Sequence, residues 1–524
     1  MNYVRGQKAK EGFLPNDLNL LYRARDHVLG DIISAQPVYV KAPFGSYTDA
    51  AYTAFKSLQA NRAQAVYAAA NDGMLHAFDA VTGMEGWAWI PSIVLPNLYK
   101  LADNNWGNLD VHQYSVDGTP SVGDAWSSGT GWKTILVAGL NGGGKGYYAI
   151  DVTDPSTPKG LWEFKWSSTC RAATTTAAMA AGATSDCHVG YTYNNPIITK
   201  LANGRWVVMV TSGYNNVNSP SASGDGLGYL YVLDAFTGEI IYKIATSAGS
   251  SGTPSGLNHI NNWVEDTIVD NTTVRVYGVD LLGNIWRFDV NDSILPAGYE
   301  ATLIGTAVDP SGSPQPISTR PELALVNASP MVFVATGRFL GSGDITDTQK
   351  QSIYGIIDPL TATTGYADLR VSLKPMEMTQ VGTGSTATRT IDCVGSNAEC
   401  NSPAGWVADL PDSGERVNVD MKLQLGTLVV ASNVPQNSAC TVGGYSWLNY
   451  LNYATGTAVS NSPGGAVSQM LSDSLAVGLN IVRLPSGQTV VITTTSDAKQ
   501  TTVGAPFDVP SPTGKRVSWR EISQ

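Results

Sequence analysis

Five cysteines are the residues of this sequence whose types and spacing most directly suggest chemistry: Cys170, Cys187, Cys393, Cys400 and Cys440. All lie in loop-like sequence rich in Ser, Thr, Ala and Asn, whereas buried free thiols usually lie in core strands. Cys170 and Cys187 flank an Ala/Thr-rich insert with little to pack against, so a disulfide that closes this loop is the simplest interpretation. Cys393 and Cys400 flank VGSNAE and are expected to pair likewise, although a Cys400–Cys440 pair with Cys393 free is the main alternative. The sequence contains no Cys-x-x-Cys, which argues against a zinc or thioredoxin-like site.

Other motifs that resemble catalytic or binding sequences stand in the wrong context. The run from Gly139 to Gly146 approaches a phosphate-binding loop, but Gly146 occupies the hydroxyl position and the following YYAIDV alternates like a strand rather than a helix. The five histidines are isolated and lack metal-ligand spacing, and His76 is expected to be a packing residue. No G-x-S-x-G sequence occurs. These motifs therefore predict no nucleotide, metal or hydrolase site.

Charge and hydropathy exclude several classes of function. The 32 Lys and Arg residues against 43 Asp and Glu give a net charge of −11, with no basic cluster of the kind that binds nucleic acid or anionic lipid. Excess carboxylate leaves cation binding open. No window of about 18 uninterrupted apolar residues occurs, so no membrane-spanning helix is expected.

One phrase recurs along the chain: a strand, a glycine-containing turn, an alternating strand ending in Asp, and then a turn and a further strand. The recurring copies lie at 65–91, 134–166, 206–244, 274–290, 331–359 and, in a weaker form, 425–459, with marker residues Asp79, Asp151, Asp234, Asp289, Asp358 and Asn452. The markers are 55 to 94 residues apart, which is longer than a compact propeller repeat and indicates inserted loops.

The repeated phrase predicts an all-β propeller. Alternating apolar residues place one strand face in a sheet-on-sheet core, and Asp with Gly in DAVTG and DAFTG predicts a tight turn. The aromatic residue that follows, such as Trp87 or Trp162, is expected to pack between neighbouring blades. We expect one quinoprotein-like propeller of seven blades, with six or eight as alternatives. A strand at about 32–40 would close the ring with a hairpin at about 474–496. Residues 1–28 would be a lead-in segment, and 24–31 and 96–104 short helical decorations.

The strand-Asp-x-x-Thr-Gly phrase resembles the blade repeat of quinoprotein dehydrogenases, which bind pyrroloquinoline quinone. Those enzymes often carry two adjacent cysteines beneath the quinone, together with a calcium-held carboxylate base. This chain has no adjacent cysteine pair, and its repeats are irregularly spaced. The alternative of a quinone enzyme is therefore carried forward, but no quinone is expected. A glycan- or matrix-binding lectin-like module is a third alternative, with Trp106 and Trp126 as candidates for stacking on sugars.

Seven phrases in order resemble the C-terminal domain of the PilY family, the PilC-type pilus adhesins. They are LGDIISAQPVYV (29–40), NDGMLHAFDAVTGMEGWAWIPS (71–92), VDGTPSVGDAW (116–126), VYGVDLLGNIWRFDV (276–290), ATGRFLGSGDITDT (335–348), GERVNVD (414–420) and GKRVSWREI (514–522). The resemblance implies a non-enzymatic, exported domain of a longer protein. It would act at the cell surface, pilus tip, outer membrane or periplasm, in type IV pilus assembly against retraction, adhesion and twitching motility. Its implied partners are minor pilins at the tip, a host or abiotic surface, and the N-terminal domain of the same protein.

The resemblance also implies a calcium loop of the form D-x-N-x-D-x-x-x-D before an Arg-x-Tyr strand. Here the corresponding run is 266–274, in which Asp266 and Asp270 match and Thr272 offers a backbone carbonyl. Ile268 and Val274 replace two oxygen ligands that a cation with six to eight ligands needs. The loop thus predicts at most a weak calcium site, and we hypothesise that this homologue works without calcium. An Arg-Gly-Asp integrin motif, present in some relatives, is absent.

Overall fold

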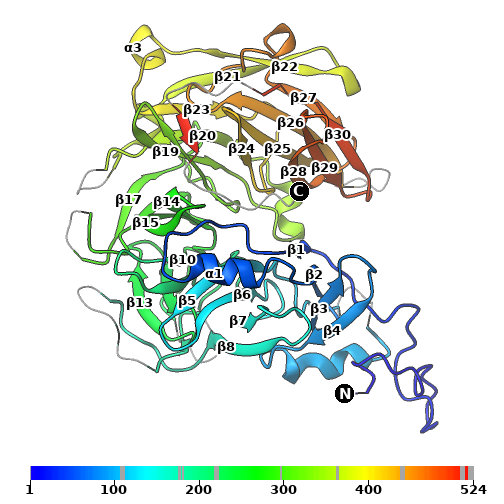
Figure 1. Cartoon of the computed structure of the whole chain (residues 1–524). Coiled ribbons are helices and arrows are strands. Elements are labelled where there is room, and N and C mark those ends of the chain that lie inside the picture. Colours follow the sequence, from blue (N-terminus) through cyan, green and yellow to red (C-terminus); the bar gives the residue numbers. More distant parts are fainter. Residues whose placement is uncertain are drawn as a thin grey trace. The chain divides into compact units, whose positions relative to one another are not determined.

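The computed structural model describes residues 2–106, 112–174, 179, 182–217, 224–294, 298–360, 365–436, 443–504, 506–507 and 514–516. Contacts within the chain divide it into two compact units, each described by itself below. Unit 1 comprises Met1–Asn258 and Ile268–Thr273, and unit 2 comprises His259–Thr267 and Val274–Gln524. Strands dominate both units, and the expected all-β class is confirmed (Figure 1).

Unit 1 is built from three successive antiparallel groups of strands, β1–β4, β5–β8 and β10–β13, with β9 added parallel to β8. Tyr67 of β2 faces Val38 of β1 on one side and Ala77 of β3 on the other. In each group the register shifts once between the third and fourth strands, at Ala77/Phe78, Ala149/Ile150 and Val232/Leu233. The strand bounds are β1 Val38–Val40, β2 Ala65–Ala70, β3 Met74–Asp79, β4 Glu85–Trp89, β5 Ser121–Ser127, β6 Gly131–Gly139, β7 Gly146–Asp151, β8 Lys159–Trp166, β9 Ser185–Asp186, β10 Ile197–Lys200, β11 Trp206–Thr211, β12 Tyr229–Asp234 and β13 Ile240–Ala245.

Unit 2 continues the pattern with β14–β17, then β18–β20 with β23, then β24–β27, and finally the three-stranded β28–β30. The inserted hairpin β21–β22 links two of these groups by pairing with β23 and β27. The bounds are β14 Ile260–Asp266, β15 Asp270–Val279, β16 Asn284–Phe288, β17 Ala301–Thr306, β18 Glu322–Val326, β19 Ser329–Ala335, β20 Ser352–Ile357, β21 Lys374–Val381, β22 Thr388–Cys393, β23 Gly405–Asp409, β24 Lys422–Gln424, β25 Thr427–Pro435, β26 Gly444–Asn452, β27 Ser468–Ser472, β28 Ala476–Arg483, β29 Thr489–Thr495, β30 Gln500–Val503 and β31 Gly514–Arg516.

The helices are short and lie in connections: α1 Tyr52–Leu58, η1 Leu95–Ala102, η2 Ser342–Thr346, α2 Leu369–Ser372, η3 Gly384–Thr386, α3 Asn397–Cys400 and η4 Pro463–Gly465. The decoration expected at 96–104 is therefore present as η1. The one expected at 24–31 is wrong, because that segment is irregular and the Arg25 guanidinium instead binds Glu11 and the carbonyl of Tyr3. None of the described helices has the length and apolar character that a membrane-crossing helix requires.

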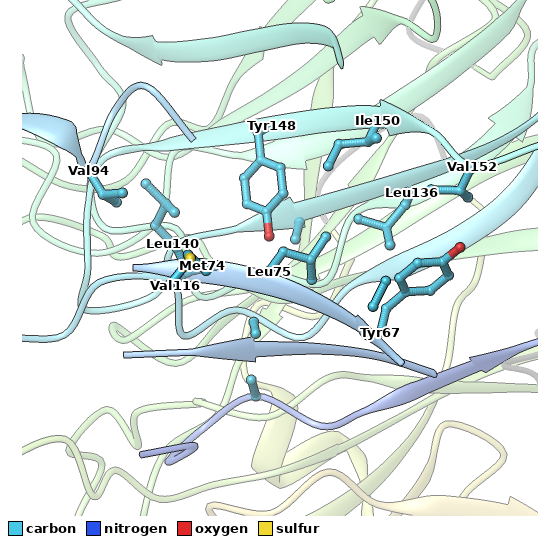
Figure 2. Close-up of a cluster of buried hydrophobic side chains, with 14 of the residues drawn as sticks. Tyr67, Met74, Leu75, Val94, Val116, Leu136, Leu140, Tyr148, Ile150 and Val152 are labelled. Carbon is cyan, nitrogen blue, oxygen red and sulfur yellow. The ribbon is translucent and has the colours of Figure 1, made fainter. Parts of the chain in front are cut away.

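Apolar side chains from facing sheets fill the cores. In unit 1, Tyr67 and Leu75 of the first sheet pack with Leu136, Tyr148 and Ile150 of the second (Figure 2). All five are at most 1% exposed. β7 and β12 are nearly continuous runs of apolar residues. A sheet that is stacked between neighbouring sheets has no solvent-exposed face, so side chains on both faces of these strands are buried.

The six marker residues occupy one structural position, at or just after the end of the third strand of a group. In each, a side-chain oxygen accepts a hydrogen bond from the backbone N–H two residues further on: Asp79 from Val81, Asp151 from Thr153, Asp234 from Phe236, Asp289 from Asn291, Asp358 from Leu360 and Asn452 from Ala454. This is the turn that Asp and Asn side chains favour. The recurring aspartate therefore shapes the turn, and Asn452 substitutes for it because its carbonyl oxygen accepts the same bond.

A tryptophan from one sheet docks onto the marker turn of the next. Trp162 Nε1 donates to the carbonyl of Ala235 at 3.0 Å, and Trp406 Nε1 donates to the carbonyl of Tyr453 at 3.0 Å. Glycine is required in the first of these turns for two reasons. Gly238 has a positive φ of 69°, and a Cβ at this position would lie 2.6 Å from Trp162. The predicted packing of Trp162 between sheets is thus confirmed.

The strands expected to close the ring each pair with strands that are near them in the sequence. Val38–Val40 pairs with β2 inside the first sheet, and β28 and β29 form a sheet with β30. A single closed ring of seven blades stays a prediction.

Candidate functional site: a cation-binding loop and a disulfide cluster

The loop expected to hold calcium is the turn between β14 and β15. Asp266 ends β14 in unit 2, whereas Asp270 and Thr272 open β15 in the segment that belongs to unit 1. That segment is held by backbone contacts: Ser46 N–H donates to the carbonyl of Ile268 at 2.8 Å, and Thr48 N–H donates to that of Val269 at 3.1 Å. Two carbonyl oxygens in the turn are therefore already acceptors of protein hydrogen bonds.

A lysine ammonium lies between the carboxylate of Asp270 in this loop and that of Asp49, which lies outside the loop. Lys200 Nζ is 2.7 Å from Asp49 Oδ1 and 3.0 Å from Asp270 Oδ1, and Lys200 is placed by the pairing of β10 with Thr272. Thr272 Oγ1 also donates to Asp270 Oδ1, at 2.6 Å. Burial alone would raise the pKa of Asp270, but the Thr272 hydroxyl and Lys200 hold it below its ordinary value. The pKa of Lys200 is raised because its two carboxylate partners outweigh desolvation.

These contacts do not fit a calcium ion. Oδ1 of Asp270 already accepts from a hydroxyl and an ammonium, and an ammonium 3.0 Å away repels a divalent cation. Across the part of the chain that the structure describes, neither Asp266 nor Asp270 belongs to a group of three His, Cys, Asp or Glu ligand atoms within 4.8 Å of one another. Lys200 supplies the positive charge that balances the carboxylates.

The structure pairs Cys170 with Cys187 and Cys393 with Cys400, with Cα atoms 4.7 and 5.9 Å apart. These are the two pairings that the simplest interpretation of the sequence predicts. Cys440, the odd cysteine, lies outside the described residues. Cys170 is exposed, whereas Cys187 is fully buried.

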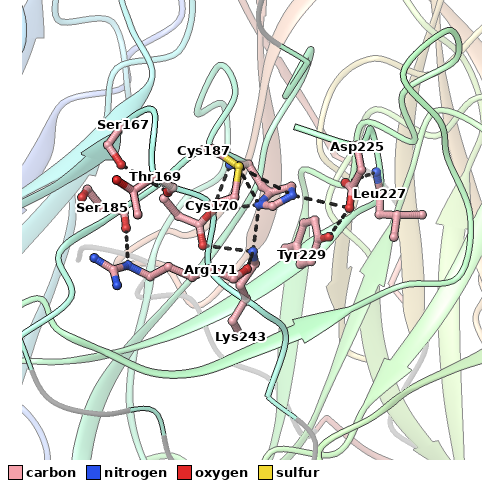
Figure 3. The surroundings of a disulfide bond; sticks show 12 residues. Ser167, Thr169, Cys170, Arg171, Ser185, Cys187, Asp225, Leu227, Tyr229 and Lys243 are labelled. Atoms are coloured by element: carbon pink, nitrogen blue, oxygen red, sulfur yellow. Dashed lines mark hydrogen bonds and ion pairs between the residues drawn. A yellow bond between two sulfur atoms is a disulfide. The ribbon is translucent and has the colours of Figure 1, made fainter. Parts of the chain in front are cut away.

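A buried charged cluster backs the Cys170–Cys187 disulfide (Figure 3). Lys243 Nζ is 3.0 Å from Asp186 Oδ2, and both side chains are 0% exposed. His188 Nδ1 lies 2.8 Å from Asp186 Oδ1, 2.8 Å from Lys243 Nζ and 3.2 Å from Cys187 Sγ. Because Asp186 precedes Cys187 and His188 follows it, the chain itself places an acid and an imidazole on either side of the buried sulfur.

The outer side of this cluster is closed by Tyr229 and Asp225. Tyr229 OH donates to Asp225 Oδ2 at 2.6 Å, and His188 Nε2 is 3.4 Å from the same oxygen. The Tyr229 ring centroid is 4.2 Å from Lys243 Nζ, a cation–π contact. Burial lowers the pKa of Lys243 against the pull of Asp186, while His188 and Lys243 together lower that of Asp186 despite its burial. The carboxylate of Asp186 is therefore ionised and can only accept hydrogen bonds.

Sequence reasoning missed this cluster, although two signals were present. Lys243 is a lone cation inside the apolar strand IIYKIA, where a charge requires a buried partner. Asp186, Cys187 and His188 are consecutive, which brings an acid, a sulfur and an imidazole together without any long-range folding. The ligand atoms of Cys170, Cys187 and His188 lie within 4.8 Å of one another, but the two sulfurs are bonded to each other and cannot serve as thiolate ligands for a metal.

The other residues singled out in the sequence lie in the following places. The glycine run leads directly into strand β7 at Gly146, so no helix N-terminus faces a phosphate. His76 is buried in β3, where its ring nitrogens contact Asp72 at 3.0 Å and Glu85 at 2.7 Å. Trp126 is 36% exposed, and Trp106 packs against the first core.

Comparison with known proteins decides the family. A family model described as the PilY1 beta-propeller domain matches residues 29–374. The chain belongs to the PilY1 β-propeller family. The predicted resemblance is thereby confirmed, and the successive antiparallel sheets are the blades of a β-propeller.

Relatives of known identity extend the PilY1 similarity over the whole chain. The chain is 33% identical over 546 residues to a type IV pilus biogenesis factor PilY1 homolog of Xylella fastidiosa, covering 100% of this chain and 41% of that protein. It is 30% identical over 506 residues to the type IV pilus biogenesis factor PilY1 of Pseudomonas aeruginosa strain PAK, covering 87% and 40%. The chain thus spans about two fifths of the length of these relatives.

The fold has a counterpart among solved structures. The crystal structure of the Pseudomonas aeruginosa PilY1 C-terminal domain superposes with a TM-score of 0.65 at 24% identity, covering 88% of this chain and 99% of that one. At this identity the likeness establishes the fold alone.

Proposed function

We propose that this chain is the non-enzymatic propeller domain of a type IV pilus biogenesis factor. The observation that carries the proposal is the PilY1 family match over residues 29–374, together with similarity over 100% of this chain, and 41% of the relative, to a PilY1 homolog named for pilus biogenesis. In this role the domain supports pilus assembly and extension against retraction, and contributes to surface adhesion and twitching motility.

The proposed location is outside the cytoplasm, at the pilus tip, outer membrane or periplasm. Two disulfides support it, because such bonds persist in oxidising compartments and are rare in the cytosol. The proposed partners are minor pilins at the tip, a host or abiotic surface ligand, and the remaining part of the same protein. In a β-propeller, the loops between strands are the segments that can present contacts to such partners.

The ion pairs at the 266–274 loop also support a domain that functions without a calcium ion bound to this loop. Lys200 balances Asp49 and Asp270, so the loop keeps its form with an internal cation. A quinone enzyme has less support, because no two cysteines are adjacent in this sequence. Adding pyrroloquinoline quinone, an alcohol and an electron-accepting dye to the purified domain tests this alternative. We expect no dye reduction, and quinone-dependent turnover would reject the non-enzymatic proposal.

Deleting the parent gene tests the pilus role. We expect surface pili to disappear and to return when retraction is also disabled, because a factor that supports extension is dispensable once nothing opposes it. Unchanged surface pili in the single deletion would contradict the proposal.

A further inference from the structure

The two disulfides of this chain differ in their surroundings. In the Cys170–Cys187 pair, Cys170 is exposed and Cys187 is fully buried. The sulfur of Cys187 contacts the imidazole of His188, which in turn lies next to the ammonium of Lys243. The Cys393–Cys400 pair has acidic sequence neighbours in Asp392 and Glu399, and its one described sulfur hydrogen bond runs to the carbonyl of Gly395. In the described part of the chain, the first pair has an imidazole in contact with a sulfur and a lysine ammonium 2.8 Å from that imidazole.

We propose that Cys170–Cys187 is an exchangeable disulfide that accepts a thiolate at Cys170, from a small-molecule thiol or from a protein dithiol. Exchange requires in-line access to one sulfur and a good leaving group at the other. The exposure of Cys170 provides the access, and the burial of Cys187 directs attack away from itself.

The leaving group is Cys187. The incoming thiolate forms a bond with Cys170 Sγ, the Cys170–Cys187 bond breaks, and its electron pair stays on Cys187 Sγ as a thiolate. No other oxidant or reductant is consumed, since the attacking thiol is the co-reactant. The product is a mixed disulfide at Cys170 and a buried Cys187 sulfur.

The cluster behind Cys187 is arranged to receive that charge. His188 Nδ1 lies 2.8 Å from Asp186 Oδ1 and 3.2 Å from Cys187 Sγ, so an N–H at this nitrogen can be donated to either group. Lys243, fully buried, brings an ammonium next to the same nitrogen. Neighbouring Lys and protonated His stabilise thiolates, and a better-stabilised leaving thiolate departs faster.

The experiment uses the Cys440→Ser chain, so that the fifth cysteine cannot supply an internal thiol. The folded protein is incubated with limiting reduced glutathione, or with a thioredoxin-type protein dithiol, then quenched by alkylation and mapped by mass spectrometry. We expect Cys170–Cys187 to open at least about tenfold faster than Cys393–Cys400, the internal control. The glutathione adduct should be on Cys170 and the alkyl group on Cys187.

The two reductants distinguish the source of the thiolate. Faster opening by glutathione identifies a small-molecule thiol, and faster opening by the dithiol protein identifies a protein partner. Equal or slower opening of Cys170–Cys187 relative to Cys393–Cys400 with both reductants, or an adduct on Cys187, would overturn the proposal.

A variant tests the positioned imidazole. His188→Asn keeps the Lys243–Asp186 pair and should slow opening of Cys170–Cys187 by about tenfold without changing the rate at Cys393–Cys400. A general loss of structure would accelerate both disulfides, so the second rate reports on folding. An unchanged rate at Cys170–Cys187 would show that His188 does not assist, and would overturn the proposed leaving-group role.

Discussion

Lys200 is the residue through which the cation requirement of the 266–274 loop can be tested. Its side chain is 11% exposed and bridges Asp49, 21% exposed, to Asp270, 53% exposed. Lys200→Met keeps the length and most of the apolar contact of the side chain while removing the ammonium. The carboxylates would then face each other without a counter-charge.

The size of the effect follows from the exposure of each partner. An exposed pair such as Lys200–Asp270 contributes about 0–1 kcal/mol. Removing one partner from a fully buried pair costs about 3–5 kcal/mol, so the part-buried Lys200–Asp49 pair should lie between these limits. We expect Lys200→Met to lower the free energy of unfolding by about 2 kcal/mol, and Lys159→Met, at an exposed lysine of β8, to change it by less than about 0.5 kcal/mol.

Acid should diminish this difference. The folded-state pKa of Asp270 is lowered, so its contribution is present above the pKa of the unfolded chain and is lost as pH falls through the folded-state value. Wild type and Lys200→Met should therefore converge in stability below about pH 4.

Calorimetry and urea unfolding provide the decisive readouts. After chelation, the wild-type domain should show no saturable calcium binding and the same unfolding midpoint with calcium or with chelator. Saturable micromolar binding that Asp270→Ala abolishes would refute the reasoning, because it would mean that calcium displaces Lys200 from the carboxylates.

Three further predictions concern blade packing and buried charge, each measured by urea unfolding. Gly238→Ala should lower the free energy of unfolding by about 2–4 kcal/mol, because the added Cβ would clash with Trp162. Gly83 has a similar φ but nothing within 4 Å of its position, so Gly83→Ala should lower it by only about 1–2 kcal/mol. Equal losses for the two variants would exclude the contact with Trp162 as the cause. Arg389→Met should lower the free energy of unfolding by about 3–5 kcal/mol, because it leaves the buried carboxylate of Glu415 without this ion-pair partner. Arg205 is 44% exposed, so Arg205→Met should lower it by less than about 1 kcal/mol. Similar values for the two variants would contradict this ranking. Burial raises the pKa of Asp280 from 3.8 to about 6, so the native state holds its proton to higher pH than the unfolded chain and stability should fall by about 3 kcal/mol as pH rises from about 3 to about 7. Asp280→Asn should flatten that slope, and an unchanged slope would assign it to other groups.

The blade pattern could be predicted because it is local. The turn at Asp234 and Gly238 is encoded within five residues, since an Asp side chain bonds the backbone two residues on and Gly adopts a positive φ. Strand alternation likewise identifies which residues enter the core. The pairing of Val38–Val40 was not predictable in this way, because a three-residue strand carries too little pattern to specify its neighbour.

The candidate sites were harder to predict because their decisive partners are distant in the sequence. Asp270 was recognisable in the loop, but Lys200 lies 70 residues before it and reaches it only through the pairing of β10 with β15. The cluster at Cys187 depends on Lys243, which is 55 residues from His188. The two disulfides were predictable because each closes a short loop, of 17 and 7 residues in sequence separation.

The most direct measurement of the central claim is a count of surface pili in a strain whose parent protein lacks only the region corresponding to residues 29–524. The same count is made with retraction disabled, and with the propeller restored in the parent protein. We expect few or no pili in the first strain and normal numbers in the other two. Normal piliation without the propeller, while retraction is active, would contradict a role of this domain in pilus biogenesis.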